Sequence, residues 1–379
     1  MNPVLKTLPT YQPGRPIEEV ARELGLDPGS VIKLASNENP LGPSRLALAA
    51  MRKSVANANL YPDGSAFYLK QKLAKKLGVT PQHLILGNGS NEILELLGHA
   101  LLSPESEVVV SQYCFAVYPI VTALFGAKLV SVPARHYGHD LDAMLTAITP
   151  KTQIVFVANP NNPTGTAVSA ERLANFLDRV PTPVLVALDA AYVEFLEKPL
   201  DLASEIVEGR RPNLILMRTF SKIYGLAGLR LGYGIGNPDF IAELEKIRQP
   251  FNVNAIAQAA ALAALDDDSH AQRTKRVTAR GLKLYSRTFK KMGLEFVPSS
   301  ANFILVRVGD GQNVFNELQK RGVIVRPMAS YQLPEWIRIS IGTPKQNERC
   351  LEGLKSILET ATTNEHESTR IEPNAPEPG

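Results

Sequence analysis

The chain has 379 residues, of which 44% are hydrophobic and 21% are charged, and its 41 basic and 37 acidic residues leave a net charge of +4. Such values are typical of an ordinary globular protein with either two domains or one large α/β unit. The charge is too small and too dispersed to favour binding to nucleic acid or to a membrane surface, so neither partner is expected.

The cysteines and the first residues bear on where the protein works. Cys114 and Cys350 lie far apart without the spacing of a redox or metal motif, so we expect reduced thiols. The N-terminal residues contain no apolar stretch of signal-peptide length, and the alanine-rich apolar run at 255–265 is too short to cross a bilayer. We therefore expect a cytoplasmic protein.

The chain begins with an expected arm and short helix at residues 1–35. Pro16 suits the first turn of a helix that continues to Leu24, with Gly25 near its end. The segment 35–43 is polar and contains two prolines, so it predicts a loop. Its asparagines could serve only as turn formers.

A strand at 83–86, a glycine-rich turn at 87–91 and a helix from Ile93 form the first motif that suggests chemistry. Backbone N–H groups at the start of a helix, together with the positive end of its dipole, attract an anion. The pattern is neither a G-x-G-x-x-G fingerprint nor a P-loop, so it predicts an anion site only. A plain tight turn explains it equally well.

Short apolar runs continue at intervals that leave room for crossover helices. The alternation predicts a largely parallel α/β sheet, with a ligand site beyond the carboxyl ends of its strands. The segment 232–236 is similar to a dinucleotide loop, but no helix pattern follows it directly, and we discard that interpretation. The expected strands cover residues 108–111, 128–132, 154–158, 184–188 and 214–217.

Polar motifs follow two of these strands. The prolines of segment 159–165 restrict the backbone to extended conformations and aim an amide side chain in a fixed direction. Asp189 closes the next strand, and Tyr192 follows three positions later. A carboxylate at such a place is often only a helix cap, and that alternative stays open.

The segment 220–230 holds a single lysine, Lys222, among small and hydroxyl residues. A lysine amine condenses with an aldehyde to form a Schiff base. An arginine with nearby hydroxyls, here Arg230 with Thr219 and Ser221, suits a phosphate dianion. An aldehyde and a phosphate on one small molecule indicate pyridoxal 5′-phosphate, although a loop with a solvated lysine would have the same sequence.

The pattern changes near residue 271, where a basic helix leads to short strands. We expect a smaller α+β domain whose strands carry Arg326 and Arg338. Arg338 lies in an apolar strand, so it needs an anionic partner unless that strand is an exposed edge. The predicted division is an N-terminal arm and helix at 1–35, a large domain at 36–270, a small domain at 271–361 and a disordered tail at 362–379.

The motifs together supply every part of a pyridoxal phosphate site. Such a site needs an amine for the aldehyde, a carboxylate at the pyridine nitrogen, donors to the ring oxygen, a phosphate cup and an aromatic face. His136 and His139 lack further ligands at metal spacing, so no metal is expected. In the order of those parts, the candidates are Lys222; Asp189; Asn162 and Tyr192; Gly89, Ser90, Asn91, Thr219, Ser221 and Arg230; and Phe115.

On these motifs the chain resembles the fold-type I aminotransferases, which depend on pyridoxal phosphate, and most closely the histidinol-phosphate aminotransferase family. The resemblance implies an α/β fold with a mostly parallel, seven-stranded sheet flanked by helices in a large domain, plus a smaller α+β domain. The segments that carry it are 35–40, 61–62, 87–90, 161–165, 189–192 and 221–230.

The resemblance also implies roles for single residues. Lys222 would be the Schiff-base lysine and proton shuttle, Asp189 would pair with the pyridinium N–H, and Tyr192 would bind the ring oxygen together with Asn162. Tyr61 would reach the cofactor of the partner subunit in a homodimer. The ring-stacking position is often tyrosine in this family, whereas here it is Phe115.

The implied reaction is a ping-pong transfer of an amino group between histidinol phosphate or imidazole-acetol phosphate and glutamate or 2-oxoglutarate, in histidine biosynthesis. Arg338 would bind the carboxylate or phosphate of the substrate, near Tyr11, Asn37 and Arg326. Fold does not fix the substrate. An aromatic amino-acid aminotransferase is therefore the main alternative, and a threonine-phosphate decarboxylase is a more distant one.

Overall fold

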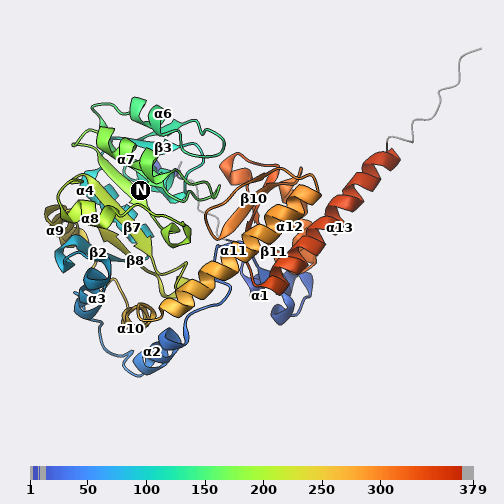
Figure 1. Ribbon diagram of the computed structural model, residues 1–379, viewed down its shortest axis with the longest axis horizontal. Helices are drawn as coiled ribbons and strands as arrows, with labels where there is room; N and C mark the ends of the chain where they lie inside the picture. The colour runs from blue at the N-terminus through green and yellow to red at the C-terminus, as the bar shows by residue number, and fades with distance from the viewer. Residues whose placement is uncertain (1–2, 7, 9–13, 369–379) are drawn as a thin grey trace, which may run out of the picture.

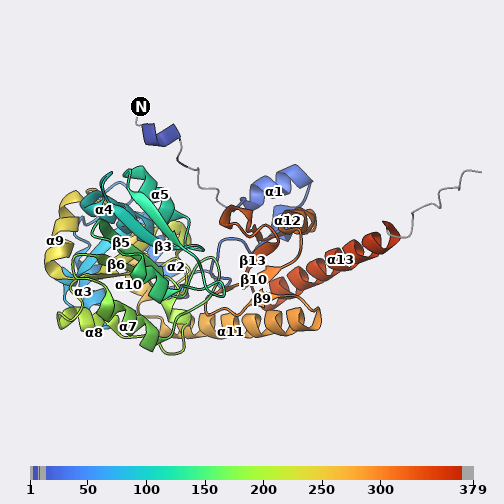
Figure 2. The same ribbon diagram turned by 90° about the horizontal axis from the view of Figure 1, so that it is seen from above.

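The computed structural model describes residues 3–6, 8 and 14–368. Figure 1 shows a large part built around a seven-stranded sheet and a smaller part built around a four-stranded sheet. Helix α11 (Asp268–Lys291) runs from the large part to the smaller one, and α13 (Pro344–Ser368) projects away from the smaller part. Figure 2 shows α11 lying along one side of both parts.

The seven-stranded sheet is mostly parallel, as the spacing of the apolar runs predicted. Its order is β2-β8-β7-β6-β5-β3-β4, and only β8 runs antiparallel to its neighbours. The strands are β2 (Leu84–Asn88), β3 (Glu107–Ser111), β4 (Lys128–Val132), β5 (Thr152–Ala158), β6 (Leu185–Asp189), β7 (Leu214–Thr219) and β8 (Leu231–Ile235).

Helices cover both faces of this sheet, which is why its central strands are apolar without alternation. In β5, Val155 and Val157 pack into one hydrophobic core, while Ile154 and Phe156 pack into the other. The first core includes α2 (Arg45–Val55), α3 (Phe67–Leu77), α6 (Leu141–Thr146), α7 (Ala170–Arg179), α8 (Leu202–Val207) and α10 (Ala255–Ala264), and the second includes α4 (Ser90–Leu101), α5 (Val117–Leu124) and α9 (Pro238–Ile247).

The smaller part combines both ends of the chain. Val20 and Ala21 of α1 (Ile17–Leu24) lie in one hydrophobic core with Tyr285 and Phe289 of α11. A four-stranded antiparallel sheet of order β12-β13-β10-β9 and a parallel pair β1-β11 complete it. Its other elements are β1 (Ile32–Lys33), β9 (Phe296–Val297), β10 (Phe303–Arg307), α12 (Gly311–Lys320), β11 (Val323–Ile324), β12 (Arg326–Pro327) and β13 (Trp336–Ser340).

Short 3₁₀ helices complete the described elements. They are η1 (Pro3–Lys6), η2 (Pro28–Ser30), η3 (Pro81–His83), η4 (Val193–Phe195), η5 (Ala227–Leu229) and η6 (Ala329–Tyr331). None of the helices in the described ranges combines the length and the apolarity that crossing a membrane requires.

The end of the chain differs from the expected tail at 362–379. Helix α13 continues to Ser368, so the backbone is helical past the expected boundary, and residues 369–379 of that tail lie outside the described residues. Buried Leu351, Leu354 and Ile357 anchor the helix. A helix that is already nucleated adds residues at little cost, even where the sequence has no apolar periodicity.

Candidate active site

A cavity of about 360 Å³ opens at the carboxyl ends of the parallel strands and is lined by both parts of the chain. Its size is typical of a small-molecule site. Tyr61 lies elsewhere on the surface, and Tyr11 falls outside the described residues. The candidates that line the cavity are Asn37, Ser90, Asn91, Phe115, Asn162, Asp189, Tyr192, Thr219, Ser221, Lys222, Arg230, Arg326 and Arg338.

Asp189 is the last residue of β6, and both of its carboxylate oxygens accept hydrogen bonds. The Tyr118 hydroxyl donates to Oδ2 at 2.8 Å, and the Ala191 N–H donates to Oδ1 at 3.0 Å. Burial raises the pKa of the carboxyl, and the two hydrogen bonds and the charge of Lys222 oppose that effect. A cationic group in the cavity, such as a protonated ring nitrogen, would stabilise the charged form further.

Lys222 lies in the loop that follows β7. Its Nζ donates to the Ser36 carbonyl at 3.3 Å and lies 5.6 Å from the centre of the Tyr192 ring. Gly225 allows this loop to approach the N-terminal segment, since its φ is +69° and a Cβ there would lie 2.2 Å from the Gly42 carbonyl oxygen. The fold thus presents the lysine amine to the same cavity as Asp189.

Tyr192 and Asn37 connect the two parts of the chain beside Lys222. Asn37 Nδ2 donates to the Tyr192 hydroxyl at 2.9 Å, and the Ser340 hydroxyl donates to Asn37 Oδ1 at 3.0 Å. Burial raises the pKa of Tyr192 to about 12, although Arg338 and Asn37 act in the opposite direction. The phenol therefore keeps its proton at neutral pH and can donate a hydrogen bond.

Arg338 is buried on β13, which lies between β12 and β10, so the alternative of an exposed edge strand is wrong. Its guanidinium donates to Asn162 Oδ1 at 2.5 Å and to the Ala35 carbonyl at 2.9 Å. The same group lies 5.1 Å from the centre of the Phe303 ring. The planar guanidinium fork suits the oxygens of a carboxylate or phosphate, so it can bind an anion in the cavity.

The expected phosphate cup is built from the end of β7 and the start of α4. The Thr219 hydroxyl donates to Ser221 Oγ at 3.0 Å, and the Ser221 N–H donates to Thr219 Oγ1 at 3.1 Å. Ser90 and Asn91 form the first turn of α4, whose N–H groups face the cavity end of the strand. These donors and the positive helix end suit a dianion.

Two glycines give the cup its shape. Gly89 has φ +79°, and a Cβ there would lie 2.4 Å from Nη2 of Arg230, so only glycine lets the guanidinium cover the turn. Gly232 on β8 lies directly behind the turn, and a Cβ there would come 2.3 Å from the Ser90 nitrogen. The anion-binding turn and β8 are therefore packed backbone against backbone.

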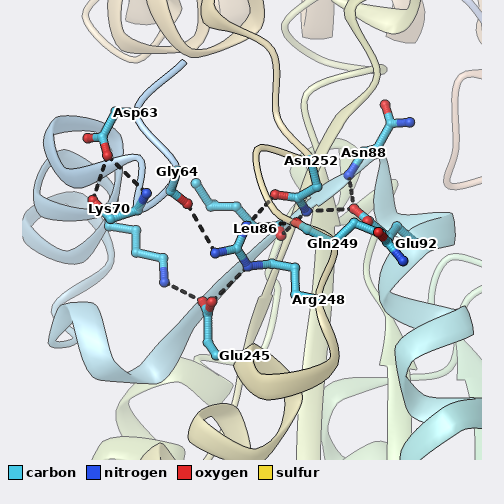
Figure 3. A network of polar contacts seen from close by, with 11 residues as sticks. Asp63, Gly64, Lys70, Leu86, Asn88, Glu92, Glu245, Arg248, Gln249 and Asn252 are labelled. Atoms are coloured by element: carbon cyan, nitrogen blue, oxygen red, sulfur yellow. Dashed lines mark hydrogen bonds and ion pairs between the residues drawn. The ribbon is translucent and has the colours of Figure 1, made fainter. Parts of the chain in front are cut away.

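A carboxylate supports this turn from behind (Figure 3). Glu92 Oε2 accepts the Asn88 N–H at 2.5 Å and the Asn252 side-chain N–H at 2.7 Å. Asn252 also donates to the Leu86 carbonyl at 3.0 Å, at the end of β2. Glu92 thus holds the start of the turn, and Asn252, from the loop between α9 and α10, holds Glu92 and the end of β2.

Further hydrogen bonds, made by Arg248, connect Asn252 with the loop before α3. Arg248 donates to Asn252 Oδ1 at 2.6 Å, to Glu245 at 2.7 Å and to the Gly64 carbonyl at 3.0 Å. We call Glu92, Asn252, Arg248 and Glu245 the brace. It connects the phosphate cup to the loop that carries Tyr61.

Phe115 and Tyr61 differ in their surroundings. Phe115 lines the cavity and contacts Tyr118 edge to face, with ring centres 5.7 Å apart. Tyr61 is 84% exposed and stacks on Phe251 at 4.8 Å, so it does not reach the cavity of its own chain. Arg326 lines the cavity near Tyr331.

Sequence reasoning missed three residues of the site. Ser340 lies two positions after Arg338 on β13, so the strand period could have indicated it. Tyr118 lies near the start of α5, three positions after Phe115, and no pattern in the sequence connected it with Asp189. Asn302, which donates to the Asn37 carbonyl at 2.9 Å, gave no signal in the sequence.

The residues present fit pyridoxal phosphate. Gly89 lets the Arg230 guanidinium lie against the turn of the phosphate cup, Asp189 is a buried carboxylate at the cavity, and Lys222 supplies the amine. Across the described ranges, no group of histidine, cysteine and acidic side chains is arranged to hold a metal ion. The arrangement can hold an aromatic cation, a phosphate and a second anion at Arg338.

Comparison with known proteins agrees with this chemistry. Residues 29–354 match the family described as aminotransferase class I and II. The chain is 51% identical over 352 residues to histidinol-phosphate aminotransferase of Akkermansia muciniphila, with 93% of this chain and 96% of that protein covered. It is also 51% identical over 361 residues to histidinol-phosphate aminotransferase 2 of Ralstonia nicotianae, with 94% and 96% covered.

Comparison with solved structures agrees with the sequence comparison. The crystal structure of histidinol-phosphate aminotransferase from Sinorhizobium meliloti in complex with pyridoxal-5′-phosphate matches with a TM-score of 0.87 at 29% identity, covering 95% of this chain and 98% of that one. An aspartate aminotransferase double mutant from Thermus thermophilus matches with a TM-score of 0.77 at 22% identity, which is a likeness of fold alone.

Proposed function

The chain belongs to the aminotransferase class I and II family and, by its identity to them, to the histidinol-phosphate aminotransferases. On that premise we propose that it transfers an amino group from histidinol phosphate to 2-oxoglutarate, using pyridoxal phosphate, as a step of histidine biosynthesis. The observation that carries the proposal is that Lys222, Asp189 and Arg338 line one cavity together with a phosphate cup.

The chain's residues divide the work of holding the cofactor and moving protons. When bound, pyridoxal phosphate supplies an electron sink for the negative charge that develops on the substrate α-carbon. Asp189 would hold the ring nitrogen and its proton, while Asn162 and Tyr192 would bind the ring oxygen. Lys222 Nζ would hold the aldehyde carbon at rest, take the proton from the substrate α-carbon and return it as an acid. Positioned acid–base groups contribute roughly 10²–10⁴-fold to a rate.

Arg338 is the proposed anion site for both substrates. A guanidinium fork binds a carboxylate and a phosphate monoester equally well in geometry, since both present two oxygens in a plane. Arg326 adds a second positive charge at the same cavity. Glutamate carries two carboxylates and histidinol phosphate one phosphate, so a site with two arginines suits both. Tyr11, outside the described residues, and Asn37 are proposed as neighbouring contacts.

A panel of amino donors tests the proposed substrate. We expect the purified protein to form glutamate from 2-oxoglutarate fastest with histidinol phosphate, with kcat/KM at least about tenfold above that for phenylalanine or tyrosine, because among these donors only histidinol phosphate brings a phosphate to the cavity that Arg326 and Arg338 line. The absorbance of the bound cofactor should change with each half-reaction. A preference for phenylalanine, or release of carbon dioxide, would contradict the proposed substrate.

We also propose a homodimer in which Tyr61 contributes to the cofactor site of the partner subunit. The surface around Tyr61 supports this proposal, because it exposes several large apolar side chains to solvent. They include Leu60, Phe67, Tyr68 and Phe251. The brace would fix this surface relative to the phosphate cup of the same chain.

The domain division and the cellular location remain proposals as well. We propose a large domain at 36–270 and a small domain at 271–361, with α1 of the 1–35 segment packed on the small domain, and the hydrophobic core that Val20 and Ala21 share with Tyr285 supports the last point. The segment Pro3–Lys6 instead contacts α5 of the large part. A cytoplasmic location is supported by Cys114 and Cys350, which are buried and form no disulfide.

A further inference from the structure

Tyr118 is a fully buried residue at the start of α5 that the proposed chemistry does not yet use. Its ring stacks on Phe156 of β5 with centres 4.6 Å apart and planes 8° apart. Its edge meets Phe115 at 5.7 Å and 84°. Contacts on the face and on the edge fix the ring plane, so the hydroxyl has a single direction.

That direction is toward Asp189. The Tyr118 hydroxyl donates to Oδ2 at 2.8 Å, while the other carboxylate oxygen accepts the Ala191 N–H. Burial, with the Asp189 charge adding to it, raises the pKa of Tyr118 well above its ordinary value. The phenol therefore stays protonated at neutral pH and can donate to the carboxylate.

We propose that Tyr118 is a positioning residue of the transamination, which acts through Asp189 to keep the ring nitrogen of the bound cofactor protonated. The inference rests on the proposed function. A carboxylate that accepts a hydrogen bond is less basic, so a proton shared between it and a pyridine nitrogen lies closer to the nitrogen. Without the phenol the carboxylate becomes more basic, and the proton moves toward Asp189. The ring then withdraws electrons less strongly.

The test removes the hydroxyl and keeps the ring. Tyr118→Phe preserves the contacts with Phe156 and Phe115 and deletes only the donor. Tyr285→Phe is the matched control, because Tyr285 is equally buried but lies in the hydrophobic core of the smaller part. Both variants lose one buried phenol hydroxyl, but only the Tyr118 hydroxyl donates a hydrogen bond, since the Tyr285 hydroxyl has no partner among the described residues. Thermal unfolding is therefore measured for each variant, and the functional comparison is made at a temperature at which both remain folded.

The main measurement is the ¹⁵N chemical shift of the ring nitrogen in holoenzyme loaded with ¹⁵N-labelled pyridoxal phosphate. We expect the parent and Tyr285→Phe to show the protonated ring, and Tyr118→Phe to shift toward neutral pyridine. In Tyr118→Phe, kcat should fall about tenfold with an unchanged KM for the amino donor, the size expected for one hydrogen bond to a charged group.

The outcomes separate this inference from the function on which it rests. A Tyr118→Phe protein with the parental ¹⁵N shift and the parental kcat would overturn the positioning role. The proposed function would still stand in that case, provided that the parent and Tyr118→Phe both bind pyridoxal phosphate. A parent protein that binds no pyridoxal phosphate would overturn the proposed function and this inference with it.

Discussion

Asp189 connects the stability of the protein with its chemistry. In the cofactor-free site, burial raises the pKa of this carboxyl despite two hydrogen bonds. A carboxyl with a raised pKa favours folding in its protonated form, so the cofactor-free protein loses stability as the pH rises through that raised value, and the loss is complete above it. In the holoenzyme, the negative charge of Asp189 would pair with the protonated ring nitrogen of the cofactor.

Asp189→Asn should therefore raise the melting temperature of the cofactor-free protein at neutral pH and lower the turnover of the holoenzyme. Asparagine keeps an acceptor for the Tyr118 hydroxyl or the Ala191 N–H but carries no charge that burial penalises. Calorimetry across a pH series checks the sign, because the gain should vanish at acidic pH, where the parental carboxyl is neutral too. Equal melting temperatures at neutral pH would count against this account of Asp189.

At the residue scale, the sequence indicated the side chains that directly end a strand. Asp189 and Thr219 close β6 and β7, and Lys222 follows within one short loop, so their convergence follows from parallel strands alone. Tyr118 and Asn302 could not be found in this way. Their hydrogen bonds to Asp189 and Asn37 depend on how a helix and a distant strand pack, which no local pattern encodes.

At the element scale, β8 is the strand of the seven-stranded sheet that sequence reasoning missed. Two of its five residues, Gly232 and Gly234, are glycines, which are depleted in strands. The structure explains Gly232 by a contact with the turn before α4, far away in the sequence. Strands β3, β5, β6 and β7 were predictable because burial on both faces makes them continuous apolar runs.

Gly232→Ala should weaken cofactor binding and reduce stability by about 1–3 kcal/mol, the usual cost of an extra methyl group in a packed interior. The added Cβ would lie 2.3 Å from the Ser90 nitrogen, and backbone cannot yield as a side chain can. Denaturant unfolding and titration with pyridoxal phosphate measure the two effects. Gly236→Ala is the control, since its Cβ would come no nearer than 3.3 Å to the Ile241 side chain and 3.6 Å to the Leu214 carbonyl oxygen. Parental cofactor affinity in Gly232→Ala would argue against the close packing of β8 on the cup.

The brace makes a separate prediction about α4. Glu92→Ala removes the acceptor of the Asn88 and Asn252 N–H groups, so the turn at 87–91 should loosen and the cofactor should dissociate several-fold faster. Glu95→Ala, an exposed change on the same helix, should leave the dissociation rate unchanged. Stopped-flow or dialysis with absorbance detection gives the rates. Equal rates for both variants would mean that the brace does not support the cup.

At the scale of the whole molecule, the cavity is lined by both parts of the chain, while Tyr61 is exposed on a separate surface. Hydrogen bonds from Asn37 to Tyr192 and from Arg338 to Asn162 connect the two parts at the cavity, so the site needs both of them. The proposed dimer adds one group from a second copy. The arrangement of two subunits was the hardest feature to predict from the sequence. Only the resemblance to a family, and no residue pattern, indicated a role for Tyr61 in the partner subunit.

Hybrid dimers test that shared site. Lys222→Ala and Tyr61→Ala homodimers should each be nearly inactive, whereas a refolded mixture should recover up to about one quarter of parental activity, because half of randomly paired dimers are hybrids with one intact site. The measurement is the specific activity of the mixture against each variant alone. A mixture no more active than its components would contradict a Tyr61 that acts across the interface.

The central claim is that the Lys222 amine holds the cofactor opposite Asp189, and borohydride reduction of the purified holoenzyme followed by peptide mass spectrometry tests it most directly. The account predicts one stable pyridoxyl-phosphate adduct, on Lys222 Nζ, and none in the Lys222→Ala variant. An adduct on another lysine, or no adduct in a protein saturated with pyridoxal phosphate, would contradict it.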